Sequence, residues 1–263
     1  MGRIAEAFDR IRASKSPGLV AYVTAGDPDL ARTAEILVSL SQNGADVIEV
    51  GVPFSDPLAD GPVIQRASER ALASGTTLRG ALKMIKENRA RIASPIVLFT
   101  YANPVLRMGE DAFARSAADA GVDGVLVLDL PVEEAGPFRA TLVDAGIDPI
   151  FLLSPTTTDA RIKASAELGA GFLYVISRLG VTGARNQVAQ DAEPLARRIR
   201  ALSDLPLALG FGISRPEHVA EVGRWVDAAV VGSALVNVIA EHGRAADVAD
   251  RAGAYVRWLK GQA

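Results

Sequence analysis

The sequence contains no cysteine, two histidines and few aromatic residues. Without cysteine the chain can form no disulfide framework, no thiolate nucleophile and no cysteine-ligated metal site, and it fits a reducing cytoplasm. His218 and His242 lie far apart along the chain, which disfavours a histidine-rich metal site. Aromatic residues make up 5% of the chain and hydrophobic residues 49%, so the core must come mainly from Ala, Val, Leu and Ile. This composition suits buried parallel strands.

Basic clusters and long apolar runs are also absent. The net charge is −3 and no segment is strongly basic, so the chain lacks the positive charge typical of proteins that bind nucleic acids or anionic membranes. No apolar stretch reaches the roughly 18 residues of a membrane span. At the start of the chain Ile4, Phe8 and Ile11 share one face among charged residues, which predicts an amphipathic helix and not a signal peptide. We therefore expect a cytoplasmic protein with a small-molecule substrate.

Short apolar runs alternate with segments of helical period along the whole chain, as in repeated βα units. The expected strands are residues 19–23, 46–50, 95–99, 124–128, 149–153, 172–176, 206–209 and 228–231. The 263 residues suit one such barrel, which commonly has about 250, and neither a linker nor a change of composition divides them. The sequence predicts an α/β protein whose residues 1–263 form a single (β/α)8 TIM barrel, with an N-terminal helix and extended loops after the strands.

Four expected helices stop at a glycine shortly before the next strand. These glycines are Gly44, Gly121, Gly146 and Gly169. Each is expected to adopt the left-handed conformation that ends a helix. The connections into the strands are therefore short, and the irregular segments follow the strands, at residues 24–28, 51–62, 100–109 and 177–187. In a βα barrel these loops form the catalytic face.

Three glycine clusters follow the last expected strands, at residues 180–183, 210–214 and 232–233. Glycine lets backbone N–H groups approach a phosphate, and Gly232-Ser233 would open a helix whose N-terminus favours an anion. Barrels often bind phosphate after strands seven and eight. Arg215 stands where a dinucleotide fingerprint needs its third glycine, so we expect the phosphate to belong to the substrate.

Glu49 interrupts an apolar strand at an inward-facing position. A carboxyl group desolvated there has a raised pKa, which suits a general acid or base, although an arginine-paired structural carboxylate is the alternative. The next loop supplies Asp56 and Asp60, and two carboxyls in different environments can take different roles. Spacing alone does not choose between these two aspartates, and it leaves Asp27 and Asp129 open as well.

The segment IEVGVPFSDPLADGP at residues 48–62 closely resembles the signature of the tryptophan synthase α chain family. The similarity continues in order through TAGDP at 24–28, YANP at 101–104, DLP at 129–131, YVISR at 174–178, GVTG at 180–183, GFGI at 210–213 and GS at 232–233. These motifs cover essentially the whole chain, and the first of them is long and specific.

The resemblance implies a lyase of tryptophan biosynthesis that cleaves indole-3-glycerol phosphate to indole and glyceraldehyde 3-phosphate, with no cofactor or metal in this chain. It implies Glu49 as the proton-transferring carboxylate, Asp60 as the carboxylate that holds the indole N–H, and Tyr174, expected to point inward, as a residue that positions substrate and Glu49. The implied indole pocket is lined by Tyr22, Phe99, Leu126 and Phe211, and Thr182 is a further substrate-binding residue. The implied phosphate site is formed by Gly183, Gly212, Gly232 and Ser233. Tyr22 stands where a phenylalanine is common in the family.

The resemblance also implies a partner, the pyridoxal-phosphate-dependent β chain of an α2β2 heterotetramer, contacted through residues 53–60 and 101–104. Loops 51–62 and 177–187 are expected to form a coupled lid in which Thr182 reaches Asp60. One alternative is a catalytically weak α-type subunit that mainly activates the β chain, against which the intact Glu49 and Asp60 argue. Another is indole-glycerol-phosphate synthase or phosphoribosylanthranilate isomerase, disfavoured because the chain lacks cysteine and any lysine in its expected strands.

Overall fold

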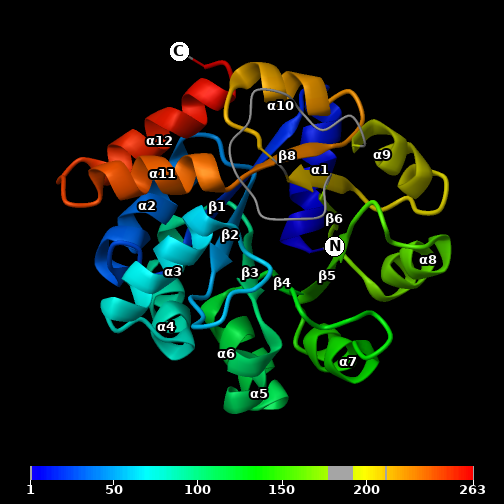
Figure 1. Cartoon of the computed structure of the whole chain (residues 1–263), viewed down its shortest axis with the longest axis horizontal. Coiled ribbons are helices and arrows are strands. Elements are labelled where there is room, and N and C mark those ends of the chain that lie inside the picture. Colours follow the sequence, from blue (N-terminus) through cyan, green and yellow to red (C-terminus); the bar gives the residue numbers. More distant parts are fainter. Residues whose placement is uncertain (1, 177–191, 211, 263) are drawn as a thin grey trace.

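The computed structural model describes residues 2–176, 192–210 and 212–262. Eight parallel strands close into a barrel in which each strand pairs with its neighbours in sequence and the last pairs with the first (Figure 1). They are β1 (Gly18–Thr24), β2 (Val47–Gly51), β3 (Ile96–Thr100), β4 (Gly124–Val127), β5 (Asp148–Leu153), β6 (Leu173–Ile176), β7 (Leu207–Gly210) and β8 (Ala228–Val231). All eight expected strands are present, and the predicted (β/α)8 barrel is confirmed.

Helices surround the barrel and follow the strands in turn (Figure 1). They are α1 (Arg3–Ser14), α2 (Leu30–Gln42), α3 (Pro62–Ala73), α4 (Leu78–Asn88), the 3-10 helix η1 (Arg89–Arg91), α5 (Ala102–Met108), α6 (Glu110–Ala120), α7 (Gly136–Asp144), α8 (Asp159–Leu168), α9 (Ala192–Arg200), α10 (Pro216–Val222), α11 (Ser233–His242) and α12 (Val248–Leu259). None of the helices in the described part of the chain is long and apolar enough to cross a membrane.

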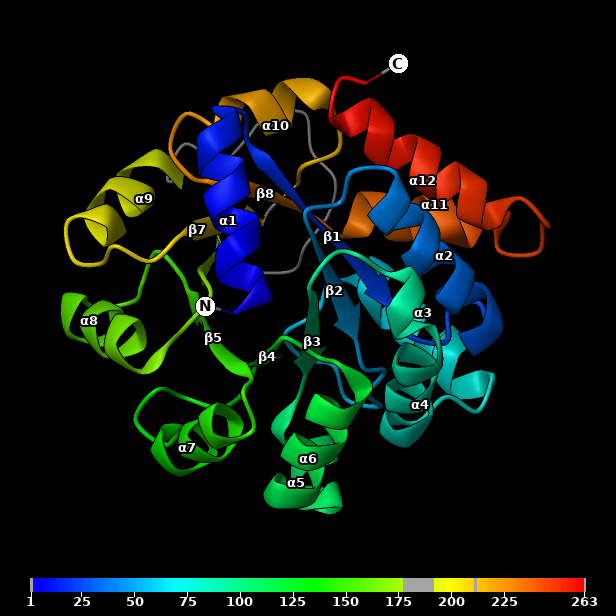
Figure 2. The ribbon, with the colours of Figure 1, turned by 180° about the vertical axis from the view of Figure 1, so that it is seen from behind.

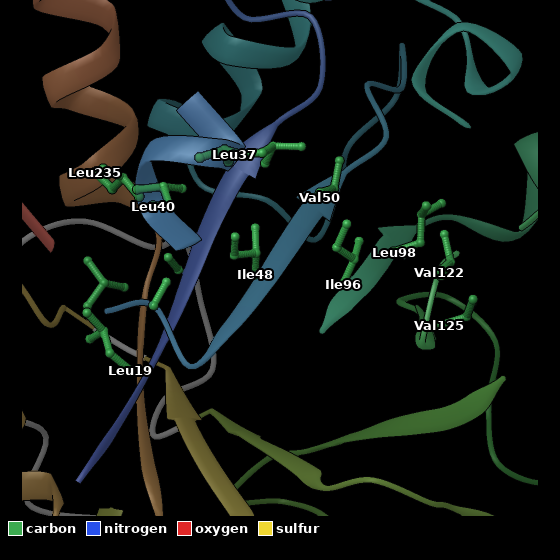
Figure 3. Packing of buried hydrophobic residues seen from close by; sticks show 14 of the residues in the cluster. Leu19, Leu37, Leu40, Ile48, Val50, Ile96, Leu98, Val122, Val125 and Leu235 are labelled. Carbon is green, nitrogen blue, oxygen red and sulfur yellow. The ribbon is translucent and has the colours of Figure 1, made fainter. Parts of the chain in front are cut away.

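The strands bury side chains on both faces, and alternate residues belong to different layers. Ile48 and Val50 of β2 point outward and pack in one layer with Leu37 and Leu40 of α2 (Figure 3). Val47 of the same strand points into the barrel and belongs to the inner cluster. The alternation therefore directs the side chain of residue 49 into the barrel as well.

Helix α1 closes the N-terminal end of the barrel, as Figure 2 shows from behind. Its residues Ile4, Phe8 and Ile11 are buried in the inner cluster, which confirms the expected amphipathic helix. Gly18 and Gly124 begin β1 and β4, and a Cβ added to them would come within 2.4 Å of Ile11 and 2.8 Å of Ile4. These glycines let α1 approach closely, so the open mouth of the barrel lies at the C-terminal ends of the strands.

Three of the four expected helix-ending glycines adopt a left-handed backbone, with φ of +97° at Gly44, +79° at Gly121 and +76° at Gly146. The prediction is wrong for Gly169, whose φ is −83°. The left-handed residue there is Gly171, with φ of +71°. A Cβ at Gly169 would lie 2.6 Å from the carbonyl oxygen of Ser165, so close packing against the end of α8 explains this glycine.

Candidate active site

Glu49 projects from β2 into the barrel and is fully buried. Neither carboxyl oxygen has a hydrogen-bond partner among the residues that the structure describes. Burial raises the pKa of Glu49 from 4.5 to about 8, because the charged form loses its contact with water. The carboxyl is therefore mostly protonated at neutral pH. No arginine among the described residues pairs with this carboxyl.

Asp60 lies on the loop between β2 and α3, where its carboxyl accepts a hydrogen bond of 3.0 Å from the hydroxyl of Tyr101. The Tyr101 hydroxyl in turn accepts a hydrogen bond of 3.1 Å from the backbone N–H of Ala59. Burial raises the pKa of Asp60 to about 6, although the hydrogen bond from Tyr101 opposes the shift. At neutral pH Asp60 is mostly ionised while Glu49 is mostly protonated, so the two carboxyls differ in charge.

The other aspartates left open by the sequence have different surroundings. Asp27 is buried and accepts two hydrogen bonds from the guanidinium of Arg70, at 2.8 and 2.7 Å. Asp129 accepts the backbone N–H of Ala102 at 2.7 Å. Asp56 is exposed to solvent. The first two hold neighbouring segments together, which leaves Asp60 as the loop aspartate with a raised pKa.

An apolar and aromatic wall stands beside the carboxyls. The rings of Tyr22 and Phe99 meet almost edge to face with centroids 5.4 Å apart, and Phe99 lies 6.2 Å from Tyr174. Leu126 is buried in the inner cluster against which Phe99 and Tyr174 pack. Tyr22 is the register partner of Glu49 on the adjacent strand. The structure thus brings four of the predicted substrate residues together around Glu49.

Glycines at two strand ends make room for the tyrosine hydroxyls. A Cβ at Gly51 would come within 2.1 Å of the Tyr22 hydroxyl oxygen, and a Cβ at Gly210 within 2.6 Å of the Tyr174 hydroxyl oxygen. Burial raises the pKa of both phenols well above the ordinary value, and the nearby charges of Asp60 and Glu49 add to the shift. Both hydroxyls therefore remain protonated and can donate hydrogen bonds.

The expected phosphate loops lie side by side. Gly210 of β7 is the register partner of Val230 of β8, so Gly212 and Gly232 each stand two residues beyond a paired position. Helix α11 begins at Ser233, which confirms that Gly232-Ser233 opens a helix. The N-terminus of a helix carries partial positive charge and favours an anion. Thr182, Gly183, Phe211 and the loop 177–187 lie outside the described residues.

A cavity of about 400 Å³ lies elsewhere, against the outer face of β4 and β5 and beside α7 and α8. Phe138, Arg139, Phe151 and Arg161 contribute to its lining, and neither Glu49 nor Asp60 does. Among the residues that are described, no group of three or more His, Asp or Glu side chains is arranged to hold a metal ion.

Comparison with known proteins identifies the family. A family model described as the tryptophan synthase alpha chain matches residues 8–261. The chain belongs to this family. It is 48% identical over 260 residues to the tryptophan synthase alpha chain of Solibacter usitatus, covering 99% of this chain and 97% of that protein. The predicted resemblance to the tryptophan synthase α chain family is confirmed.

Solved structures of tryptophan synthase have the same fold as this alpha chain. A chain of Mycobacterium tuberculosis tryptophan synthase superposes with a TM-score of 0.91 at 38% identity, covering 99% of this chain and 98% of that one. A chain of the tryptophan synthase a2b2 complex from Pyrococcus furiosus gives a TM-score of 0.87 at 42% identity, covering 93% and 98%.

Sequence reasoning missed the part that Tyr101 plays in the site of this alpha chain. In the sequence the residue stands out only as part of the YANP segment, whereas its buried hydroxyl holds both Asp60 and the backbone beside it. Phe54, on the same loop as Asp60, packs on the Tyr101 ring with centroids 5.0 Å apart. The available signal was its position directly after β3, where a polar aromatic residue faces the neighbouring loop.

Proposed function

We propose that this chain, working as a single barrel domain in the cytoplasm, cleaves indole-3-glycerol phosphate to indole and glyceraldehyde 3-phosphate as the α subunit of tryptophan synthase. One observation carries the assignment of the site. Glu49, a fully buried carboxyl without a partner among the described residues, shares the barrel mouth with Asp60, a carboxyl that is mostly ionised at neutral pH. Family membership supports the reaction.

Cleavage of the bond between indole C3 and the glycerol chain requires three events at the substrate. C3 gains a proton, the ring nitrogen becomes positive, and the hydroxyl on the adjacent glycerol carbon loses its proton to form the aldehyde. Protonated Glu49 delivers its proton to C3, and ionised Asp60 accepts the ring N–H and stabilises the positive charge. The Glu49 carboxylate then removes the hydroxyl proton while the C–C electrons return to the ring, so Glu49 ends protonated as it began.

The remaining predicted residues hold the two ends of the substrate. Tyr22, Phe99, Leu126 and Phe211 surround the indole ring, and Thr182 is a further substrate-binding residue. Tyr174 positions both the substrate and Glu49. The phosphate binds to the backbone of Gly183, Gly212 and Gly232 and to Ser233, at the start of α11. The adjacency of the β7 and β8 loops supports this placement, because both can approach one phosphate group.

A β chain that carries pyridoxal phosphate completes the α2β2 enzyme and receives the indole. The Pyrococcus furiosus structure concerns mutual activation within an a2b2 complex of tryptophan synthase, which supports this assembly. In this chain Leu58 is 92% exposed, on the loop after β2, and Leu106 is 62% exposed, on α5 after β3. Large exposed apolar side chains next to the barrel mouth are what a partner surface requires.

The test is release of indole from indole-3-glycerol phosphate, measured with and without a β chain. Glu49→Gln keeps the shape of the side chain but removes the titrating group, so turnover is expected to fall by at least about 10²-fold. Glu167→Gln makes the same change at an exposed site on α8, outside the proposed partner segments, and serves as the control. Near-normal turnover of the Glu49→Gln variant would overturn the assignment. A wild-type chain that stimulates the β chain but releases no indole would favour the weak-subunit alternative.

A further inference from the structure

The segment that leaves β7 is held by side chains from two different helices. The backbone N–H of Ser214 donates to Nδ1 of His218, on α10, at 3.3 Å. The carbonyl oxygen of Ser214 accepts a hydrogen bond of 2.9 Å from the hydroxyl of Tyr255, on α12. Between them and the strand, Ile213 is buried in the outer hydrophobic core. Both backbone polar groups of Ser214 are thus fixed.

This fixation matters for Gly212, two residues earlier. Gly212 has φ of +64°, a left-handed conformation, and it has no side chain of its own to define its orientation. Its position is set from one side by Gly210, which is paired in the barrel, and from the other by Ile213 and Ser214. The direction of the Gly212 backbone therefore depends on the contacts of Ser214.

We propose that His218 and Tyr255 are positioning residues that hold the Gly212 backbone in the orientation that binds the substrate phosphate. The inference rests on the proposed function, because it assumes a phosphate at the β7 and β8 loops. Neither residue needs to touch the substrate. Together they order the loop before the phosphate binds, so the free energy of phosphate binding is not reduced by the entropy cost of ordering the loop.

The two contacts can be removed one at a time. Tyr255 also packs on Trp258 with ring centroids 5.6 Å apart, so Tyr255→Phe keeps the ring and deletes only the hydroxyl. His218 accepts the hydrogen bond from Ser214 through Nδ1. In His218→Asn the amide oxygen can replace Nδ1 as acceptor, whereas His218→Leu cannot accept. Ser116→Ala is the matched control, because it deletes another hydroxyl-to-carbonyl bond, on α6 across the barrel (Figure 1).

The experiment measures the affinity for glycerol 3-phosphate, the affinity for indole, and kcat and KM for indole-3-glycerol phosphate. Loss of one hydrogen bond in the loop is expected to weaken glycerol phosphate binding and raise KM about three- to tenfold in Tyr255→Phe and His218→Leu. We expect kcat and indole affinity to stay within about twofold, His218→Asn to recover most of the loss, and Ser116→Ala to behave as wild type.

The outcomes separate this inference from the function on which it rests. If the wild-type chain with a β chain releases no indole, the proposed function fails. If the wild type is active but Tyr255→Phe binds glycerol phosphate with unchanged affinity, the positioning role is overturned. It is also overturned if indole and glycerol phosphate lose affinity equally, because that result indicates general loosening. Thermal unfolding of each variant checks the fold, and Tyr255→Phe decides the matter alone if His218→Leu does not fold.

Discussion

Replacement of Glu49 by glutamine tests the physical basis of the site through stability as well as activity. The wild-type carboxyl is fully buried and lacks a partner among the described residues, so its charged form is strongly disfavoured in the folded protein. The unfolded chain exposes the same carboxyl to water, where it ionises with an ordinary pKa. Glutamine has the same shape and never ionises. We therefore expect Glu49→Gln to stabilise the fold at neutral pH while it abolishes the proton transfers.

The magnitude follows from the shift in the pKa of Glu49, from 4.5 to about 8. Below the pKa of Glu49 in the unfolded chain, the carboxyl is protonated in both states and does not change the free energy of unfolding. As pH rises, the unfolded state loses its proton first, and the free energy of unfolding falls until the folded carboxyl also ionises. With about 1.4 kcal/mol per pKa unit, the loss is about 1 kcal/mol near pH 5, about 3 kcal/mol near pH 7 and about 5 kcal/mol near pH 9. The glutamine variant avoids this loss.

Urea unfolding of both proteins over this pH range measures the difference. The free-energy difference should grow from about 1 to about 5 kcal/mol in favour of Glu49→Gln, which is a slope that only a raised carboxyl pKa produces. Glu167→Gln, at an exposed position on α8, should show no such slope. A constant difference between wild type and Glu49→Gln across the range would refute the raised pKa, and with it the reason for assigning the proton transfers to this residue.

Three further results are expected. The pH profile of kcat/KM should be bell-shaped, falling below about pH 6 as Asp60 protonates and above about pH 8 as Glu49 ionises; a rate that still rises through pH 9 would contradict the assignment. Tyr101→Phe removes a hydrogen bond that favours ionised Asp60, so the acid limb should move to higher pH, and an unmoved limb would show that Tyr101 does not tune Asp60. Gly210→Ala should cost about 1 to 3 kcal/mol of unfolding free energy in the wild type but less beside Tyr174→Phe, since the nearest contact is the hydroxyl oxygen at 2.6 Å and the next is 3.1 Å; equal costs would exclude that clash.

The barrel itself could be predicted from the sequence because its strands are buried on both faces. Such strands appear as continuous apolar runs of Val, Ile, Leu and Ala, and the helices between them keep their own period. The expected segments 19–23 and 228–231 correspond to β1 and β8, the two strands that close the barrel. The prediction of helix ends from glycine failed at Gly169, because a glycine is also selected by close packing.

The candidate site was only partly predictable, because its decisive contacts join residues far apart in the chain. Glu49 is recognisable as a local conflict, an acid in an apolar strand. Asp60 could not be separated from Asp27 by spacing, since the difference is made by Arg70, 43 residues from Asp27, and by Tyr101, 41 residues from Asp60. No local pattern reports such pairings. The family resemblance supplied the choice that the residues alone left open.

Three partly buried acids at the starts of strands differ from Glu49 in their partners. Asp46, Asp123 and Asp227 each stand just before a strand. Each accepts a hydrogen bond of 2.7 Å from a backbone N–H near the start of a neighbouring strand, from Leu19, Ile96 and Leu207 respectively. Each also pairs with a cation, from Lys260, Arg89 and Arg12.

These contacts set a pattern that Glu49 breaks. Despite burial, hydrogen bonds from a backbone N–H and two arginines lower the pKa of Asp227, so this aspartate stabilises the fold in its charged form. Glu49 has none of these partners among the described residues, and burial raises its pKa instead. The acids at the closed end of the barrel each have a cation, whereas no described residue supplies one to Glu49, so this buried carboxyl costs the fold stability. The protonated carboxyl that results is what the proposed reaction requires.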